Sequence, residues 1–430
     1  MQPRAYSSAW GGLDRFLPMT SFATRLALVS VSAFSLSWIG VASASSQRPT
    51  SAPDEAEGLS DTAFELDSRA NDRIADGCRL VLGRVVKGSI PGASAALVLP
   101  DGKLVATVAG LASMDTREPL ATDHRMLAGS TGKSLVAAAV LQLAQEGQFE
   151  LNARAAALFE PIPDWLRALP NGEEFTVRHL LRHESGLPRY VFKPDFVGTL
   201  ASEPERRWQP AELLAFVAED RPLFAPGEGW AYADTNYIVL GMLIEKLTGS
   251  SYYEYARKSF IEPLRLDQTV ATDAGKIPRM AQGHVVAGRA MRIPDRTLAD
   301  GTFTYNVQFE WCGGGWASTP GDLARWAARF YGGEALEQDY SQELLEGVLA
   351  EGLGPGARYG VGAILRDTPA GRFVGHDGFM PGYLTTLAWF PDHGIAAALQ
   401  INSDDSVAVG RPLALVLADL VEVAARELAK

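Results

Sequence analysis

The 430-residue sequence holds only two cysteines, and it has no excess of positive charge and no long uninterrupted apolar run. Cys78 and Cys312 stand far apart and form no metal-binding pattern, and the sequence leaves open whether they form a disulfide. The net charge of −12 gives no electrostatic support for binding nucleic acid. The composition, 47% hydrophobic and 21% charged, is that of an ordinary globular protein with a large core.

The apolar run near the N-terminus covers residues 26–41, which is shorter than the roughly 20 residues needed to cross a membrane. Arg25 precedes this run, and Ala42-Ser43-Ala44 follows it as a small-residue cleavage site. We therefore expect residues 1–44 to be an export signal cleaved after Ala44, with Met19 as an alternative start. This predicts a periplasmic or secreted protein without a stable membrane anchor. Residues 45–58, rich in Ser, Pro, Ala and acid, predict a flexible linker.

Turn signals and apolar periodicity place predicted strands at both ends of the chain and helices between them. A helix is predicted over residues 60–86, and two strands over 93–99 and 103–109 flank the hairpin signal Pro100-Asp101-Gly102. Further helices are predicted over residues 175–182, 210–218, 234–247, 323–331 and 412–428, and further strands over 359–365, 372–375, 384–390 and 395–401.

This order predicts an α+β fold. In it, residues 59–115 and 332–430 form an antiparallel sheet domain flanked by N- and C-terminal helices, and residues 116–331 form a mostly helical inserted domain. Residues 188–208, which are rich in aromatics, are predicted to be an irregular loop. A loop of that length within a compact domain is often a lid or a binding loop.

The first chemical motif begins a helix that is apolar on most sides. Residues 135–144 are nearly all Leu, Val or Ala, and Gly147 is a C-terminal cap. Ser130 and Lys133 are three apart and share one face of the first turn. A serine nucleophile needs a nearby base, and an amine beside a buried helix can serve if burial lowers its pKa. Taken alone, this spacing is common by chance, and it is explained more simply by Ser130 as a helix N-cap.

Two other interpretations of nearby residues are disfavoured. Gly132-Lys133-Ser134 matches the end of a phosphate-binding loop, but Leu127 stands where that loop requires its first glycine. His179 and His183 have the spacing of a zinc pair, but Leu180 stands where the metalloprotease pattern has glutamate. We therefore expect no metal site and no cofactor.

Two further motifs lie later in the chain. Tyr232 and Asp234 lead into an apolar helix, where Asp234 could simply be an N-cap, although that does not explain Tyr232. A tyrosine held near a lysine ammonium can have a lowered pKa and can shuttle protons. His376 follows a short predicted strand and lies between glycines, which predicts exposure at a cleft.

Taken together, Ser130-x-x-Lys133, Tyr232-x-Asp234 and His376-x-Gly378 resemble the serine β-lactamase and penicillin-binding-protein superfamily. The branch is the one that contains class C β-lactamases, DD-carboxypeptidases, D-aminopeptidases and family VIII esterases, and the resemblance covers residues 89–403. It implies a β-lactamase/transpeptidase-like fold. It also implies an exported, cofactor-free serine hydrolase that acts through an acyl-enzyme on a small molecule or peptide, peptidoglycan-derived or an ester. The alternative is a non-catalytic penicillin-binding or sensor homologue.

The resemblance also implies roles for single residues. Ser130 is the nucleophile, Lys133 is its base or keeps Tyr232 ionised, and Tyr232 takes the serine proton or returns it to the leaving group. His376 stands where many relatives carry lysine, and it is expected to bind a substrate carboxylate or assist proton transfer. The backbone N–H groups of Ser130 and Phe379 are expected to form the oxyanion hole.

The remaining implied residues bind substrate. Asp377 and Gly378 adjoin His376, and Asp234 stands where β-lactamases and DD-peptidases usually have asparagine. An ionised aspartate accepts hydrogen bonds but cannot donate them, so a substrate amide oxygen would lose its donor there. Asp234 is expected either to repel a carboxylate and favour an amine, or to pair with Lys133.

Overall fold

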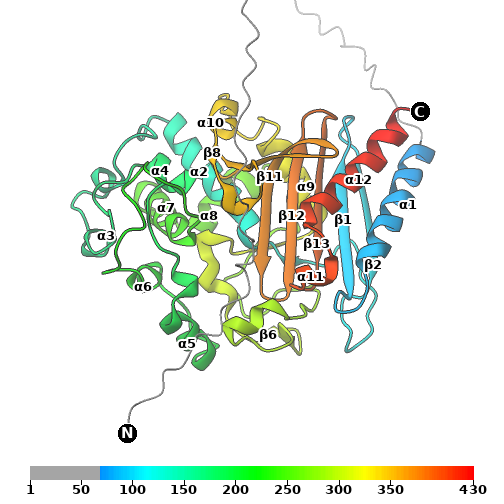
Figure 1. The fold of residues 1–430 in the computed structure, drawn as a ribbon, viewed down its shortest axis with the longest axis horizontal. Coiled ribbons are helices and arrows are strands. Elements are labelled where there is room, and N and C mark those ends of the chain that lie inside the picture. The colour runs from blue at the N-terminus through cyan, green and yellow to red at the C-terminus, as the bar shows by residue number, and fades with distance from the viewer. Residues whose placement is uncertain (1–67) are drawn as a thin grey trace, which may run out of the picture. The chain divides into compact units, whose positions relative to one another are not determined.

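The computed structural model describes residues 68–430. The predicted export signal, the linker and the first residues of the first helix lie outside this range. An antiparallel eight-stranded sheet, in the order β2-β1-β13-β12-β11-β10-β9-β8, forms one half of the described chain (Figure 1). Its strands are β1 (Gly92–Val98), β2 (Leu104–Gly110), β8 (Val348–Leu349), β9 (Arg358–Tyr359), β10 (Ile364–Thr368), β11 (Gly371–Met380), β12 (Tyr383–Phe390) and β13 (Ile395–Ile401).

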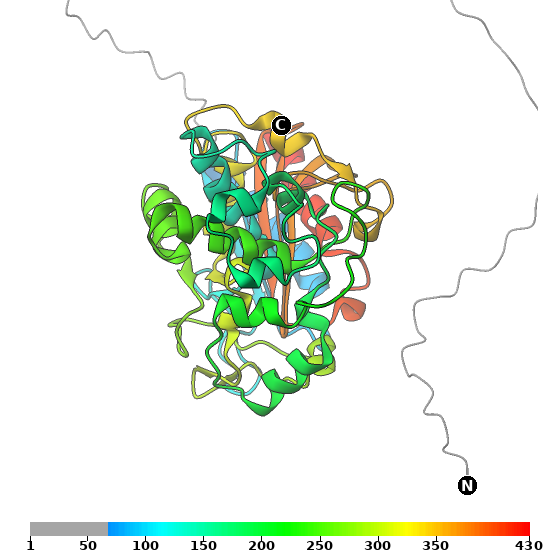
Figure 2. The ribbon, with the colours of Figure 1, turned by 90° about the vertical axis from the view of Figure 1, so that its left-hand side faces the viewer.

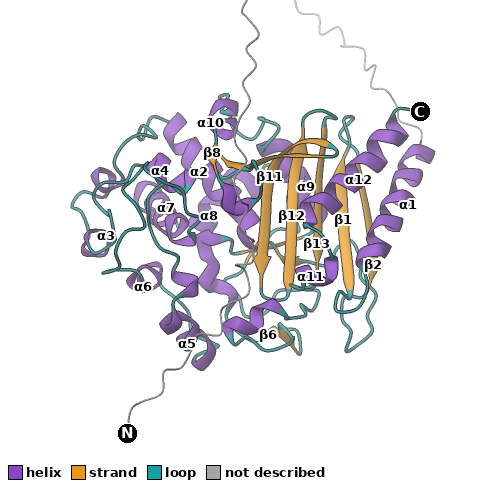
Figure 3. Cartoon of the chain, in the orientation of Figure 1, coloured by secondary structure: helices purple, strands orange, loops and turns teal. Residues whose placement is uncertain are grey.

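Helices and short strands make up the other half (Figure 3). The helices are α1 (Ser68–Val85), α2 (Lys133–Gln145), α3 (Asp164–Arg167), α4 (Val177–Arg182), α5 (Pro194–Ser202), α6 (Pro210–Ala215), α7 (Asp234–Thr248), α8 (Tyr252–Ala256), α9 (Pro320–Phe330), α10 (Ser341–Leu345), α11 (Ser406–Val409) and α12 (Leu413–Leu428). Two small sheets contain β3 (Met126–Leu127), β7 (Trp316–Ser318) and β4 (Val270–Ala271), and β5 (Leu298–Ala299) and β6 (Thr302–Phe303).

Helices cover both faces of the large sheet. Helices α1 and α12 pack on one face, and α9 packs on the other. The alternation along β13 explains this arrangement, because Ala397 and Leu399 belong to the core under α1 and α12, whereas Ala396 and Ala398 belong to the core of the helical half. In Figure 2 the green helical segments lie in front of the orange strands, which places the helical half against one side of the sheet.

The fold class predicted from the sequence is confirmed. The hairpin predicted at Pro100-Asp101-Gly102 joins β1 to β2, and the four predicted C-terminal strands all belong to the large sheet. The strand predicted over residues 359–365 is instead divided into β9 and β10, because Gly362 has a φ of +65° and turns the chain. The predicted division into two domains stays a prediction.

The prediction of an irregular loop over residues 188–208 was wrong. Nine of these residues form helix α5, which begins with Pro194 and has Asp195 in its first turn. Phe196 and Leu200, four apart, are buried on one side of this helix. Within residues 68–430, none of the helices combines the length and the apolar character that crossing a membrane requires.

Candidate active site

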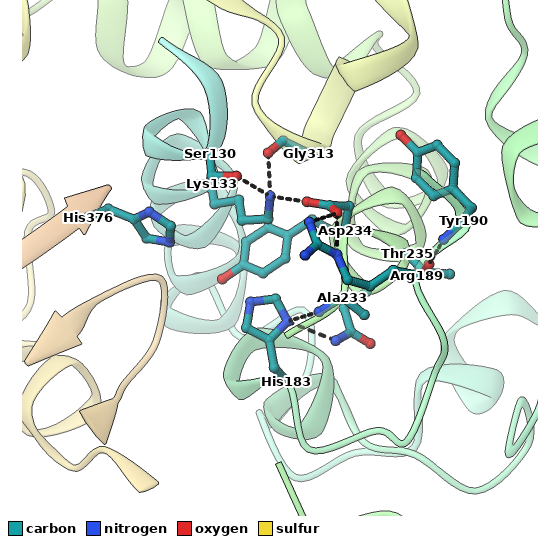
Figure 4. A network of polar contacts seen from close by, with 12 residues as sticks. Ser130, Lys133, His183, Arg189, Tyr190, Ala233, Asp234, Thr235, Gly313 and His376 are labelled. Carbon is teal, nitrogen blue, oxygen red and sulfur yellow. Dashed lines mark hydrogen bonds and ion pairs between the residues drawn. The ribbon is translucent and has the colours of Figure 1, made fainter. Parts of the chain in front are cut away.

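Ser130 lies in a 3₁₀ turn, η1 (Gly129–Gly132), that runs directly into α2. Neither η1 nor α2 has a side-chain N-cap, so the interpretation of Ser130 as an N-cap was wrong. Its hydroxyl instead accepts a hydrogen bond from Lys133, with 3.1 Å between Nζ and Oγ (Figure 4). The apolar sequence of α2 explains the position, because burying this helix on most sides carries its first residue, Lys133, into the protein interior.

All three N–H donors of the Lys133 ammonium are directed at oxygens. Besides Ser130 Oγ, they reach Asp234 Oδ1 at 2.7 Å and the carbonyl oxygen of Gly313 at 2.5 Å. The side chain is completely buried. Because an ammonium has three donors and no acceptor, this arrangement fits the protonated form of Lys133.

The condition under which Lys133 could act as the base, a pKa lowered by burial, is therefore not met. Burial does act to lower the pKa of Lys133, but attraction to Asp234, Tyr232 and Glu310 acts in the other direction. The result is a pKa above the usual lysine value. In the free protein Lys133 is a cation, and it has no lone pair with which to accept the serine proton.

Asp234 is held by two cations at once. Its Oδ1 faces Lys133, and its Oδ2 accepts hydrogen bonds from Arg189 Nη2 at 2.7 Å and Nε at 3.0 Å. Burial acts to raise the pKa of Asp234, but Arg189 and Lys133 outweigh that effect and hold the pKa well below its usual value. Of the two expectations for Asp234, pairing with Lys133 is the one that the geometry supports. Its charge is offset, so it does not present a free anion to a substrate.

Tyr232 lies directly beside these charges. Lys133 Nζ is 5.0 Å from the centre of its ring, and the His183 ring packs against it with 4.2 Å between the ring centres. The Tyr232 hydroxyl is buried and makes no hydrogen bond of standard geometry among the described residues, but it lies close enough to Ser130 and Lys133 for both to act on its pKa. Burial raises the pKa of Tyr232, while Lys133 acts to lower it, and the net result lies above the usual value. The free protein therefore holds both Lys133 and Tyr232 protonated at neutral pH.

His376 lies inside β11 and not at the end of a short strand. Its side chain is only 1% exposed, so the predicted exposure at a cleft was wrong. Burial lowers the pKa of His376 to about 4, which leaves the ring neutral at pH 7. Nδ1 lies 2.6 Å from the carbonyl oxygen of Asp377 and must carry the proton, because a carbonyl only accepts. Nε2 then accepts from the Tyr359 hydroxyl at 2.9 Å. A neutral ring with both nitrogens bonded is poorly suited to bind a carboxylate.

Strand β11 brings the backbone of Phe379 to the serine turn. Strand β10 pairs only with residues 371–375 of β11, so residues 376–380 leave one edge open, and η1 lies against that edge. A two-residue turn follows Met380, so Met380 and Tyr383 form a hydrogen-bonded pair and the backbone N–H of Met380 faces β12. Because backbone groups alternate in direction along a strand, the N–H groups of Asp377 and Phe379 face the open edge. Gly378 is needed for this approach, because a Cβ there would lie 2.1 Å from the carbonyl oxygen of Ala128.

The Asp377 side chain does not reach the serine. Successive residues of a strand point to opposite faces, and Asp377 shares the face of Phe373 rather than that of His376. Its carboxylate bonds to Arg366 at 2.6 Å and to the Thr386 hydroxyl at 2.8 Å. Only its backbone can contribute to the site, so a substrate-binding role for its side chain is not supported.

Three residues beside the site went unnoticed in the sequence. Arg189 directly follows the turn sequence Ser185-Gly186-Leu187-Pro188. This position beside a turn was the only sequence signal that could have marked Arg189 as a site residue. Glu310 is 8% exposed and has no side-chain hydrogen bond within the described chain. Burial and the charge of Asp234 raise the pKa of Glu310 to about 7. Tyr359 lies in a predicted strand, but its contact with His376 joins residues of different strands, which the sequence did not indicate.

The two histidines considered as a zinc pair and the two cysteines have structural positions in the fold. His179 caps α4 reciprocally with Thr176, and His183 ends the same helix with a φ of +63°. Cys78 and Cys312 are free, buried thiols, and burial raises the pKa of Cys78 to about 12.

Comparison with known proteins adds to this geometry. The Beta-lactamase family matches residues 74–422. Penicillin-binding protein 4* of Bacillus subtilis (strain 168) is 27% identical over 293 residues, which are 66% of this chain and 62% of that protein. Protein flp of Staphylococcus aureus (strain COL) is 28% identical over 185 residues, which are 43% of this chain and 35% of that protein. The matched part is thus less than two thirds of the length of either relative.

Two solved structures have the same fold. A D-stereospecific amidohydrolase from Streptomyces sp. is 25% identical with a TM-score of 0.67, and the match covers 78% of this chain and 97% of that one. The D-amino acid amidase of Ochrobactrum anthropi SV3, complexed with L-phenylalanine amide, is 24% identical with a TM-score of 0.67, and the match covers 84% of this chain and 100% of that one.

Proposed function

This chain belongs to the beta-lactamase family, and we propose that it is a serine hydrolase that cleaves small amides or esters through an acyl-enzyme on Ser130. The observation that carries the proposal is the partly buried contact of 3.1 Å between Lys133 Nζ and Ser130 Oγ, at the start of a helix. A hydroxyl that accepts a hydrogen bond from a fixed cation is oriented, and its own proton is free to leave in another direction.

Tyr232 is the group that receives this proton. Lys133 is already fully protonated and bonded, whereas the Tyr232 hydroxyl is buried, makes no hydrogen bond of standard geometry among the described residues, and lies beside the ammonium. In the reactive form Tyr232 is ionised, and its phenolate is stabilised by Lys133. The Ser130 oxygen then attacks the substrate carbonyl carbon, and the serine proton passes to the Tyr232 oxygen. Tyr232 returns this proton to the leaving amine or alcohol as the bond to it breaks.

The second half of the reaction uses the same groups. A water molecule gives a proton to Tyr232 and attacks the acyl carbon, and the serine oxygen leaves and recovers a proton. Backbone N–H groups of Ser130 and Phe379 would stabilise the oxyanion in both halves, and one such donor typically contributes about 3 kcal/mol. The open edge of β11 beside η1 supports this role.

The names of the similar proteins support a proposal for the substrate class. D-stereospecific hydrolysis of small amides is favoured, because the two similar structures are named for that reaction. Short esters and peptidoglycan-derived D-peptides are further candidates, the latter because of the similarity to penicillin-binding protein 4*. The signal pattern of residues 1–44 supports export, with the reaction taking place in the periplasm or outside the cell.

A labelling and turnover experiment tests this function. The mature chain is treated with a fluorophosphonate and with a fluorescent penicillin, and it is assayed on D-amino acid amides, short 4-nitrophenyl esters and D-Ala-D-Ala peptides. We expect labelling that depends on Ser130 and turnover of at least one substrate class. Labelling without any turnover would favour the alternative, a penicillin-binding sensor. An absence of Ser130-dependent labelling with either probe would contradict the acyl-enzyme.

A further inference from the structure

Arg189 is the part of the charged cluster that solvent can reach. Its side chain is 33% exposed, whereas those of Lys133 and Asp234 are 0% and 3% exposed. The guanidinium carbon lies 5.2 Å from the centre of the Tyr232 ring and 4.4 Å from that of Phe192, and Phe192 is itself 65% exposed. Arg189 is therefore a solvent-accessible cation beside the proposed proton carrier, Tyr232.

The guanidinium has donors to spare. Of its five N–H groups, the Nε–H and one Nη2–H bond to the single oxygen Oδ2 of Asp234. The second Nη2–H and both Nη1–H groups make no hydrogen bond to the described chain. Two of the remaining N–H groups, one on each terminal nitrogen, have the parallel arrangement that binds a carboxylate in bidentate fashion.

Arg189 is not needed to hold its own segment in place. The Pro188 carbonyl accepts a hydrogen bond from the Thr235 hydroxyl at 2.6 Å, and the same hydroxyl accepts one from the Tyr190 N–H at 3.3 Å. The Tyr190 hydroxyl donates to the carbonyl of Phe309 at 2.9 Å, and its ring is completely buried. The backbone on both sides of Arg189 is thus fixed by other contacts, so its side chain is available for a role beyond anchoring the segment.

The other basic groups near the site are poorly placed to bind an anion. Lys133 is enclosed and uses all its donors, and His376 is neutral with both ring nitrogens bonded. Arg366 pairs with Asp377 on the opposite face of the sheet. With one anion, Asp234, between Lys133 and Arg189, these three groups carry a net charge of +1, to which Glu310 adds a negative charge only above its pKa of about 7. The exposed part of the positive charge is on Arg189.

We propose that Arg189 is a specificity-determining residue, and that it binds a carboxylate on the acyl part of the substrate. Asp234 orients the Arg189 guanidinium. The guanidinium then provides the hydrogen-bond donor that an asparagine side chain at position 234 would provide directly. The inference rests on the proposed function, since it assigns the acyl side of that same site. It replaces the sequence-based expectation that Asp234 favours an amine, because the charge that meets the substrate is positive.

Three 4-nitrophenyl esters with the same leaving group test the proposal: the monoester of succinic acid, the butyrate, and the 4-(trimethylammonio)butyrate. The rate that remains in Ser130→Ala is subtracted as background. We expect wild type to prefer the anionic ester over the neutral one, and both over the cationic one. In Arg189→Met the ratio of kcat/KM for succinate to butyrate should fall about 10- to 100-fold, the range for losing a charged hydrogen bond.

Arg206→Met is a matched control. Arg206 is 31% exposed, pairs with Glu203 and Glu212, and lies 4.6 Å from the Trp208 ring, but none of these partners belongs to the site. The ratio should be unchanged in this variant. If Arg189→Met fails to fold, Arg189→Met with Asp234→Asn removes the cation and the anion together, and the same fall is expected there.

Binding of free succinate, measured by thermal shift, separates this proposal from the proposed function. We expect succinate to stabilise wild type and Arg206→Met, but not the Arg189 variants. If succinate binds in a way that depends on Arg189 but no ester is turned over, the carboxylate-binding role of Arg189 is supported and the proposed hydrolase activity is contradicted. Ser130-dependent turnover with an unchanged ratio in folded Arg189 variants would overturn the subsite and keep the hydrolase.

Discussion

Lys133 and Asp234 form a completely buried ion pair, with 2.7 Å between Nζ and Oδ1. Breaking such a pair by removing one partner is usually costly, because the other charge is left buried alone. Here Asp234 also keeps Arg189, so removal of Lys133 leaves an anion that is still paired. The ion pair thus fixes the ionisation state of the groups beside Ser130.

Replacing Lys133 by alanine is expected to abolish acylation of Ser130 while the protein stays folded. The variant loses the cation that orients the serine hydroxyl and stabilises ionised Tyr232. Stability should fall by only about 1 to 3 kcal/mol, because Arg189 still neutralises Asp234. Fluorophosphonate labelling and thermal melting measure the two effects. Acylation at a wild-type rate would show that Lys133 has no role in catalysis.

The rate of acylation should rise with pH over the whole range from about 6 to 9. Tyr232 must lose its proton to act, and burial places its pKa above the usual value of 10.0. Below that pKa, the ionised fraction, and with it kcat/KM, grows about tenfold for each pH unit. A pH–rate profile on a neutral ester measures this. A plateau beginning below pH 7.5 would point to a base with a much lower pKa.

Asp234→Asn should move this profile towards lower pH. The Asp234 charge acts to raise the pKa of both Lys133 and Tyr232, so its removal lowers both. A shift of about 1 to 3 pH units is expected for loss of an adjacent charge. Asp377→Asn is the matched control, because Asp377 also pairs with an arginine but lies on the other face of the sheet. An unshifted profile in Asp234→Asn, or an equal shift in Asp377→Asn, would contradict the assignment.

Glu310→Gln is expected to stabilise the protein above neutral pH. In the folded state, burial and Asp234 raise the pKa of Glu310 from 4.5 to about 7, although Lys133 and Arg189 oppose this. The folded protein then holds this proton more tightly than the unfolded chain, so the stability contributed by protonated Glu310 is lost as pH rises from 4.5 to about 7.

Glutamine stays neutral and avoids this loss. The variant should match wild type near pH 4.5 and be more stable by roughly 1 to 3 kcal/mol at pH 8, since one pKa unit corresponds to about 1.4 kcal/mol. Denaturant unfolding at both pH values measures the difference. Equal stability of the two proteins at pH 8 would show that Glu310 is not a buried carboxyl of raised pKa.

Local patterns predicted the elements that bring the site together, because each depends on nearby residues. The hairpin of β1 and β2 follows from Pro100-Asp101-Gly102, and α2 follows from its apolar run. Helix α5 was not predicted, because the segment was interpreted from its aromatic residues and the helical spacing of Phe196 and Leu200, four residues apart, was overlooked. The Arg189–Asp234 pair joins residues 45 positions apart, and no local pattern can show such a contact. The same reason explains why burial of His376 and the raised pKa of Lys133 were not foreseen.

The most direct test of Ser130 as the acylated residue is intact-mass spectrometry after fluorophosphonate treatment, followed by peptide mapping. We predict that wild type gains one probe, located on the peptide that contains Ser130, and that Ser130→Ala gains none. Ser134→Ala is the matched control, because Ser134 lies one turn further along and donates to the Thr131 carbonyl instead; it should be labelled like wild type. A probe attached elsewhere, or equal labelling of Ser130→Ala, would contradict the account.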